Sequence, residues 1–195
     1  MSVRILHISD VHCDSKRLAK VLNSERYDLV LATGDFECIE TVDILAGVKA
    51  FAVTGNMDDI EVRRGLEKLG ISLDGRVTAF GDITIGGLGG LDPVDDVERL
   101  KETLGSFGKL DVLISHHPPV GVLDEPQPGL HIGLREVREL VEGVRPRLHL
   151  FGHVHETPGH VVRGGTIHVN AGPLKRGYYA LVHYSKDIIV QIKKL

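Results

Sequence analysis

The chain has 195 residues, a formal net charge of -4, 42% hydrophobic residues and 26% charged residues. This length supports one substantial hydrophobic core and is short for two full domains, so we expect a single domain over residues 1–195. The negative charge excludes a whole-molecule field that would attract an anionic membrane, and it argues against long nucleic acid as the main substrate.

The first third of the chain alternates strands with helices. Hydrophobic periodicity predicts strands at 3–8, 29–32 and 48–53, and helices at 15–24, 37–45 and 58–69. Connections this short imply parallel strands joined by right-handed crossovers. The polar residues that follow each strand then lie at the same edge of the sheet. Open α/β sheets bind their ligands at this edge.

The pattern changes in the rest of the chain. It predicts strands at 71–80, 82–87, 111–114 and 148–151, helices at 94–104 and 134–141, and a final β-rich run at 161–162, 166–169, 178–184 and 188–192. We therefore expect two sheets with helices outside them. No linker, internal repeat or low-complexity segment divides the sequence.

The N-terminal residues, the apolar runs and the two cysteines indicate the cellular compartment in which the protein is expected. The first residues lead directly into a strand pattern, so we expect no signal peptide. No apolar run reaches the roughly 20 residues of a membrane helix. Cys13 and Cys38 form no CxxC pair, and we expect two small buried side chains rather than a disulfide framework. These features predict a cytoplasmic protein.

Metal-ligating residue types follow five of the predicted strands. They are Asp10 and His12, Asp35, Asn56, His116, and His153 with His155. Such a mixture of carboxylates, imidazoles and an amide suits Mn, Fe, Zn, Co or Ni better than Mg or Ca. A single Asp-x-His is usually a surface turn, but the whole set, each member at a strand end, indicates a metal site.

These motifs resemble those of the calcineurin-like metallophosphoesterases. The matching segments are Asp10-Val11-His12, Gly34-Asp35, Gly55-Asn56-Met57-Asp58, His116-His117-Pro118-Pro119 and Gly152-His153-Val154-His155. The match runs from about residue 3 to residue 173. The resemblance implies an α/β fold, specifically a metallophosphoesterase-type α/β/β/α sandwich of two mixed β-sheets flanked by helices.

The resemblance also implies a site for two divalent transition-metal ions, with Mn first and Fe, Zn, Ni or Co as alternatives. One ion would be held by Asp10, His12, Asp35 and His155, and the other by Asp35, Asn56, His116 and His153. The implied reaction is hydrolysis of small phosphate esters, phosphodiesters favoured, by a hydroxide bridging the two ions. The alternative is a catalytically weak or inactive scaffold for protein partners. The oligomeric state is left open, with a homodimer among the alternatives.

Met57 departs from the family pattern. Many members carry His there, and that residue is thought to protonate the leaving group, which a thioether cannot do. The chain is therefore closest to the small, minimal branch with Cys or Met at this position. Asp35, Asn56 and His117 are the expected catalytic residues, with His117 a candidate replacement acid. His7 and His168 lie within strand patterns and are expected to be packed or hydrogen-bonded.

Overall fold

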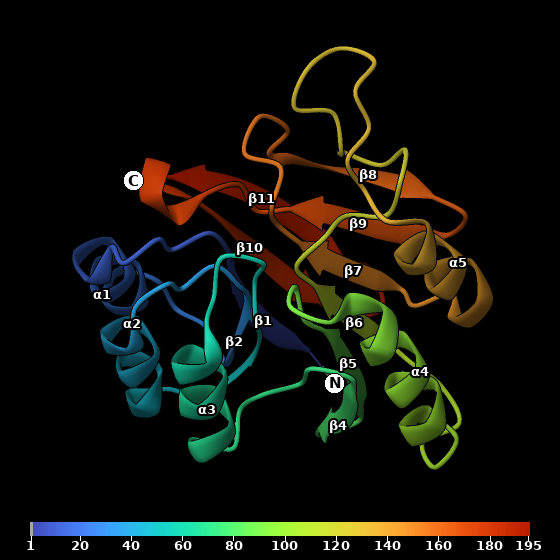
Figure 1. The fold of residues 1–195 in the computed structure, drawn as a ribbon, viewed down its shortest axis with the longest axis horizontal. Helices are drawn as coiled ribbons and strands as arrows, with labels where there is room; N and C mark the ends of the chain where they lie inside the picture. The colour runs from blue at the N-terminus through green and yellow to red at the C-terminus, as the bar shows by residue number, and fades with distance from the viewer. Residues whose placement is uncertain (1) are drawn as a thin grey trace.

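The computed structural model describes residues 2–195, which form two β-sheets packed face to face with helices on both outer sides (Figure 1). The strand order is β11-β10-β1-β2-β3 in the first sheet and β4-β5-β6-β7-β9-β8 in the second. Both sheets are mixed, because each contains parallel and antiparallel strand pairs. The α/β/β/α sandwich expected from the sequence is confirmed.

The elements follow the expected order along the chain. The first sheet contains β1 (Val3–Ile8), β2 (Leu29–Thr33), β3 (Ala50–Val53), β10 (Tyr178–Tyr184) and β11 (Ile189–Lys194). The second contains β4 (Arg76–Phe80), β5 (Ile83–Leu88), β6 (Val112–Ser115), β7 (Leu148–Phe151), β8 (Gly159–Arg163) and β9 (Thr166–Asn170). The helices are α1 (Ser15–Ser24), α2 (Ile39–Ile44), α3 (Ile60–Lys68), α4 (Pro93–Leu104) and α5 (Arg135–Val144), with 3₁₀ turns at Leu45–Gly47 and Leu174–Arg176.

Strand alternation divides the hydrophobic residues among three layers. In β1, Ile5 points between the two sheets, whereas Leu6 and Ile8 pack against the layer of α1, α2 and α3. A third cluster lies between the second sheet and α4 with α5, where Leu113 meets Leu140. Both faces of the central strands are therefore buried, which is why they read as continuous apolar runs.

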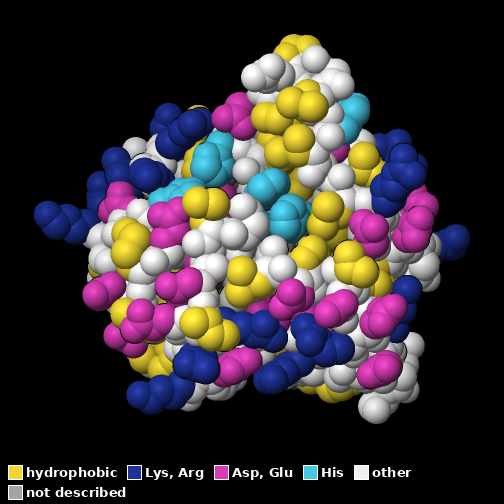
Figure 2. Space-filling model, viewed as in Figure 1, with side chains coloured by type: hydrophobic (Ala, Val, Ile, Leu, Met, Phe, Trp, Pro, Cys, Tyr) yellow, Lys and Arg dark blue, Asp and Glu magenta, His cyan; other side chains and the backbone are white. Residues whose placement is uncertain are grey.

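The parallel strands set the position of the site. The strands β1, β2 and β3 run parallel in one sheet, and β5, β6, β7 and β9 run parallel in the other. The loops that follow their carboxyl ends meet where the two sheets adjoin. Figure 2 shows histidine side chains gathered at the centre of this face, below a projecting loop.

The strand predicted at 71–80 begins only at Arg76. In the preceding segment the Asp74 carboxylate accepts hydrogen bonds from the Thr54 backbone N–H at 2.9 Å and from its hydroxyl at 2.8 Å. Gly75 then takes a left-handed φ of 65°. The Asp74 contacts and the turn at Gly75 therefore interrupt the strand. Ser72 and Asp74 form only isolated β-bridges, with Ala52 and Gly87.

The expectation of two separate buried cysteines is wrong. Cys13 and Cys38 form a disulfide with a Cα–Cα distance of 5.1 Å, and Cys13 is exposed. The bond joins the loop after β1 to the loop after β2, which also pair through the backbone N–H of Cys13 and the Phe36 carbonyl at 3.0 Å. Disulfides are rare in reducing compartments, so the cysteines no longer argue for the cytoplasm. Within residues 2–195, no helix is long and apolar enough to span a membrane.

Candidate metal centre

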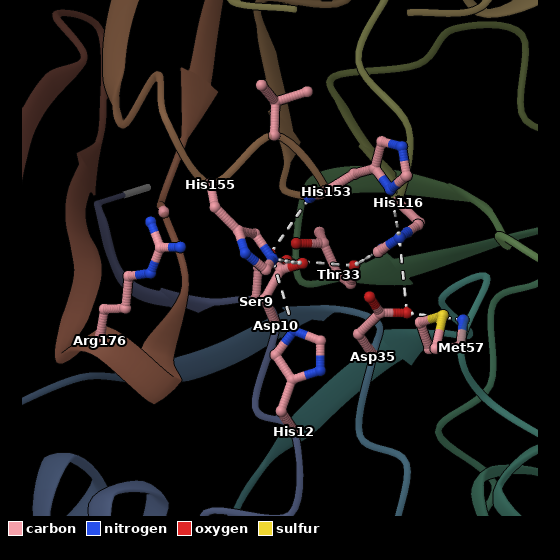
Figure 3. Close-up of polar contacts among 12 residues, drawn as sticks. Ser9, Asp10, His12, Thr33, Asp35, Met57, His116, His153, His155 and Arg176 are labelled. Carbon is pink, nitrogen blue, oxygen red and sulfur yellow. Dashed lines mark hydrogen bonds and ion pairs between the residues drawn. The ribbon is translucent and has the colours of Figure 1, made fainter. Parts of the chain in front are cut away.

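Five loops build the site, one after each of β1, β2, β3, β6 and β7 (Figure 3). Three loops belong to the first sheet and two to the second. Together they bring all seven predicted metal ligands into one connected cluster, which has two parts.

The first part of the cluster combines the loop after β1 with the loop after β7. His155 Nε2 lies 3.0 Å from Asp10 Oδ1, and His12 Nε2 lies 3.4 Å from His155 Nε2. One ligand atom from each of these residues lies within 4.8 Å of the other two. Asp10 is fully buried, while the two imidazoles are partly accessible. This group could hold one ion.

The second part centres on His116. Its Nε2 atom lies 2.7 Å from Asn56 Oδ1, 3.2 Å from His153 Nδ1 and 3.5 Å from Asp35 Oδ1. Asp10, Asp35 and His116 form the second group of ligand atoms within 4.8 Å of one another. Asp10 thus belongs to both groups, whereas the family resemblance implies that Asp35 bridges. The bridging role of Asp35 stays a prediction.

The proton positions within this cluster fit a cation. His116 Nδ1 donates to the Thr33 carbonyl at 2.7 Å, which leaves the lone pair of Nε2 as the one that can ligate an ion. That lone pair faces the oxygens of Asn56 and Asp35, which also only accept. His12 is held in the same way, because its Nδ1 lies 2.8 Å from Glu37 Oε1 and its Nε2 faces His155. Acceptor atoms directed at one another across a buried space would be stabilised by a positive charge between them.

The pKa values keep several of these groups in their ligating forms. Burial would raise the pKa of Asp10, but the hydrogen bond from His155 and the imidazole of His116 lower it to about 2. Burial and the neighbouring His116 lower the pKa of His153 to about 4. The hydrogen bond to Asp10 raises the pKa of His155, which favours the protonated ring and therefore opposes metal binding at this residue. Above mildly acidic pH, Asp10 is therefore ionised and His153 is neutral, as metal coordination needs.

The backbone of the site is unusual. Six of the eight non-glycine residues with left-handed φ among residues 2–195 are proposed ligands or lie within two residues of one, namely Asp10, His12, Cys13, Asp35, Glu37 and His153. Such conformations cost about 1–2 kcal/mol each and persist only where the surroundings impose them. Glycines allow the loops to meet: a Cβ on Gly55 would overlap Asp35 Oδ1, and one on Gly152 would overlap Ser9 Oγ.

Two further carboxylates position the ligands. Asp58 accepts hydrogen bonds from the backbone N–H groups of Asp35 at 3.1 Å, Glu37 at 2.7 Å and Gly55 at 2.7 Å, and burial raises its pKa. It thereby joins the loop after β2 to the loop after β3. Glu37 orients His12, as described above. Asp58 belongs to a motif visible in the sequence, but nothing in the sequence around Glu37 indicates its partner.

His117 and Met57 both border the second group, His117 at His153 and Met57 at Asp35. The His117 ring packs 4.5 Å from the His153 ring, and burial, with the neighbouring His116 and His153, lowers its pKa to about 2. The ring is therefore neutral near pH 7, and its role as an acid stays a prediction. The Met57 side chain is 58% exposed, and its backbone N–H donates to Asp35 Oδ1 at 2.9 Å. The exposed position leaves room for a different residue at the mouth of the site.

A basic depression borders the first group. Its volume is about 570 Å³, and His12, Lys16, Arg17 and Lys175 are among the residues that line it. Lys16 and Arg17 stand in no sequence motif that would indicate a phosphate contact. These two lie at the start of α1, where they follow the loop that carries Asp10 and His12.

The sequence of this chain matches a known family and part of a known protein. The family model described as the calcineurin-like phosphoesterase superfamily domain matches residues 3–187. The human metallophosphoesterase domain-containing protein 1 is 45% identical over 64 residues, which are 32% of this chain and 20% of the relative. The chain therefore matches only about a fifth of that relative's length.

Solved structures share the fold over the full chain at low identity. A protein from Thermus thermophilus superposes with a TM-score of 0.77 at 19% identity, covering 98% of this chain and 99% of that one. A structure described as a novel archaeal phosphodiesterase gives 0.60 at 15%, covering 97% and 99%. Vacuolar protein sorting 29 from Cryptosporidium parvum gives 0.56 at 15%, covering 100% and 98%.

Proposed function

The chain belongs to the calcineurin-like phosphoesterase superfamily, and from this premise we propose that it is a metal-dependent phosphoesterase that favours phosphodiesters. The observation that carries the proposal is the cluster of acceptor atoms around His116 Nε2 and Asp10. It brings seven proposed ligand side chains from two sheets together in a face open to solvent.

The proposed ion sites use the residues of the two groups. Asp10, His12 and His155 would hold one ion, Asn56, His116 and His153 the other, and Asp35 would lie between them. When bound, two divalent ions would lower the pKa of a shared water and offset the negative charge that develops on the phosphoryl group. The ligand set favours transition metals, and we propose Mn first.

The remaining residues of the site would position these ligands and the substrate. Thr33 and Glu37 fix which ring nitrogen of His116 and of His12 faces the site. Lys16 and Lys175 line the depression beside His12 and would bind a non-reacting anionic group of the substrate. The depression is open, which suits small esters, and the net charge of -4 disfavours long nucleic acid.

A chelator experiment tests the proposal. Protein stripped of metal is assayed with bis-p-nitrophenyl phosphate and p-nitrophenyl phosphate while Mn, Ni, Co, Zn and Mg are added separately. We expect a transition metal to restore diester hydrolysis in the wild type and in Asp43→Asn, an exposed change on α2. Asp35→Asn should remain inactive. Equal inactivity of all three proteins with every metal would contradict the proposal.

Met57 provides a test of leaving-group preference. Because a thioether gives no proton and His117 is neutral, we propose that the protein favours esters with acidic leaving groups. Met57→His should raise the rate on a phenyl ester more than on a p-nitrophenyl ester, by about ten-fold or more. The change is feasible because the side chain is largely exposed. An unchanged rate ratio for the two esters would count against a missing acid.

The second candidate function is a non-catalytic scaffold for protein partners. It is favoured only by the shared fold of vacuolar protein sorting 29, at 15% identity. Failure of the chelator experiment would make it the better proposal. The single domain over residues 1–195, the cytoplasmic location and a homodimer remain predictions; the oxidation state of Cys13 and Cys38 in cells bears directly on the location.

A further inference from the structure

A second cavity lies on the other side of the loop that carries His116 and His117. Its volume is about 440 Å³, within the range of small-molecule sites. It lies between α5, the turn joining β8 to β9, and the loop after β6. None of the seven proposed metal ligands lines it.

The cavity wall carries three arginines and a single carboxylate. Arg138, Arg145 and Arg163 line it together with Glu142. Glu142 accepts from Arg138 Nε at 2.8 Å, while Arg163 Nη1 donates only to the Gly121 carbonyl, at 2.6 Å. Two positive charges on this wall therefore have no carboxylate partner within the cavity. Figure 2 shows Lys and Arg side chains grouped at this side of the molecule.

Two of the guanidinium groups converge on one point. Gly121 has a left-handed φ of 80°, and the position that its Cβ would take lies 3.5 Å from Arg163 Nη1 and 3.6 Å from Arg138 Nη1. The two cations are thus closer than one Debye length, about 8 Å at physiological ionic strength, and they repel each other, although Glu142 at the Nε side of Arg138 offsets part of this repulsion. An anion seated between them would relieve this repulsion and accept several N–H bonds.

Arg145 reaches the same cavity from a strained position. It caps the end of α5 with a φ of 48°, where glycine or asparagine is usual. Arginine in this conformation costs about 1–2 kcal/mol. Its Nε donates to the Glu142 carbonyl at 3.4 Å, which holds the side chain beside the cavity.

The floor of the cavity is apolar. Pro119, Val122 and Val141 line it, and both valines are buried. A ligand with an apolar body would contact the atoms of these side chains that remain accessible, which a bare inorganic ion would leave in water. From the arginines and this floor together, we propose that the cavity binds a small organic anion whose phosphoryl head lies between Arg138 and Arg163 and whose apolar part covers Val122 and Val141.

The bound ligand would contact the active-site loop. Pro119 and Val122 belong to this loop. A series of buried polar contacts also connects the lining residue His168 to it. Ser115 Oγ donates to the His117 carbonyl at 2.7 Å, His149 Nε2 lies 2.8 Å from that hydroxyl, and His149 Nδ1 lies 3.2 Å from His168 Nδ1. The cavity is thus a separate site that shares a wall with the proposed metal centre.

Phenylphosphonate, which has the proposed head and an apolar ring and resists hydrolysis, is the probe for the test. It is titrated into the zinc-loaded full chain while amide shifts are followed by NMR. The amides of Gly121 and Gly164 report this cavity, and those of Gly55 and Gly152 report the metal centre. We expect saturable shifts at Gly121 and Gly164. Benzyl alcohol, which has the same ring without charge, should not produce them.

Variants identify the groups responsible. Arg138→Gln and Arg163→Gln should each weaken the binding seen at Gly121 by about ten-fold or more, since each removes a charge-assisted contact. Arg135→Gln, an exposed change on the same helix, is the matched control and should bind as the wild type does. Shifts confined to Gly55 and Gly152, no shifts at millimolar probe, or equal binding by all variants would overturn the proposal.

Discussion

At the scale of single residues, the site depends on groups that never touch the proposed ions. Glu37 is the clearest case, because its carboxylate fixes the tautomer of His12 from another loop. Asp58 similarly holds the backbone of Asp35 and Gly55 together. Such outer partners commonly determine how well a ligand set binds its metal.

Glu37→Ala tests this role. Without the carboxylate, the His12 ring can turn and exchange tautomers, so we expect metal affinity to fall by about 10- to 100-fold. Isothermal titration with Mn measures the change. Glu37→Gln, which keeps an acceptor oxygen, should lose less affinity. If Glu37→Ala binds as tightly as Glu40→Ala, an exposed change on α2, the carboxylate does not orient the ligand.

Asp74 links stability to pH. Burial raises its pKa from 3.8 to about 6 even though Thr54 donates two hydrogen bonds to it. The folded state therefore holds this proton more tightly than the unfolded state. Its stabilising contribution is complete below pH 4 and is lost as pH rises through 6, with an upper limit of about 3 kcal/mol.

Asp74→Asn should remove this dependence, because asparagine resembles the protonated acid and can keep both contacts with Thr54. We expect the variant to lose less unfolding free energy than the wild type between pH 4.5 and pH 7.5, as measured by urea denaturation. Asp82→Asn, an exposed change in the turn before β5, is the control. Parallel pH profiles for the wild type and Asp74→Asn would refute the assignment.

The sequence indicated the proposed ligands but not the support that Glu37 gives to His12, for a physical reason. A ligand such as His155 stands in a short motif at a strand end, and both features are local. The contact between Glu37 and His12 depends instead on how two loops fold against each other, with Asp10 N–H donating to the Gly34 carbonyl at 3.0 Å. No local pattern encodes such a contact, and the arginine cavity was missed for the same reason.

At the scale of elements, strands and helices with strong hydrophobic periodicity were predicted well. Segments whose conformation depends on a side-chain contact with another part of the chain were not. Both β1 and α1 have the predicted ends, since alternation and the Asp14 cap define them. The segment before β4 has an alternating sequence, yet the buried contact of Asp74 with Thr54 fixes it as irregular chain. The disulfide was missed because Cys13 and Cys38 are brought together only by the pairing of β1 with β2.

That disulfide stabilises the two loops that carry Asp10, His12 and Asp35. It spans 25 residues, for which loop-closure entropy gives a stabilisation of about 3–4 kcal/mol. The double change Cys13→Ser and Cys38→Ser should lower the unfolding free energy by about this amount. Urea denaturation under oxidising conditions measures the loss.

Reductant provides the control for the disulfide. It should destabilise the wild type toward the level of the double-serine variant and leave that variant unchanged. Equal unfolding midpoints for the oxidised wild type and the double variant would show that the covalent bond adds nothing to the backbone pairing already present between the two loops.

At the scale of the whole molecule, the site joins the two sheets. Asp10, Asp35 and Asn56 follow strands of the first sheet, whereas His116 and His153 follow strands of the second. The hydrogen bond from His116 Nδ1 to the Thr33 carbonyl already crosses between the sheets. An ion held by both sets would add further links that exist only in the folded state.

Metal binding should therefore stabilise the entire fold. With free Mn at 100 times its dissociation constant, each site adds about 2.7 kcal/mol to the unfolding free energy. Thermal unfolding with Mn and with chelator measures this difference in Tm. Asp43→Asn should respond like the wild type, and Asp35→Asn should respond less. A Tm that does not change with metal would exclude tight binding by this cluster.

The left-handed backbone of the site has a consequence for protein design. Asp10, His12, Asp35 and His153 all present their side chains from conformations that an ordinary strand or helix does not provide. Copying the seven ligand side chains onto the regular elements of another scaffold would therefore not reproduce their directions. A transplant would have to carry whole loops with Gly55 and Gly152, so the transferable unit is a set of backbone segments rather than a list of residues.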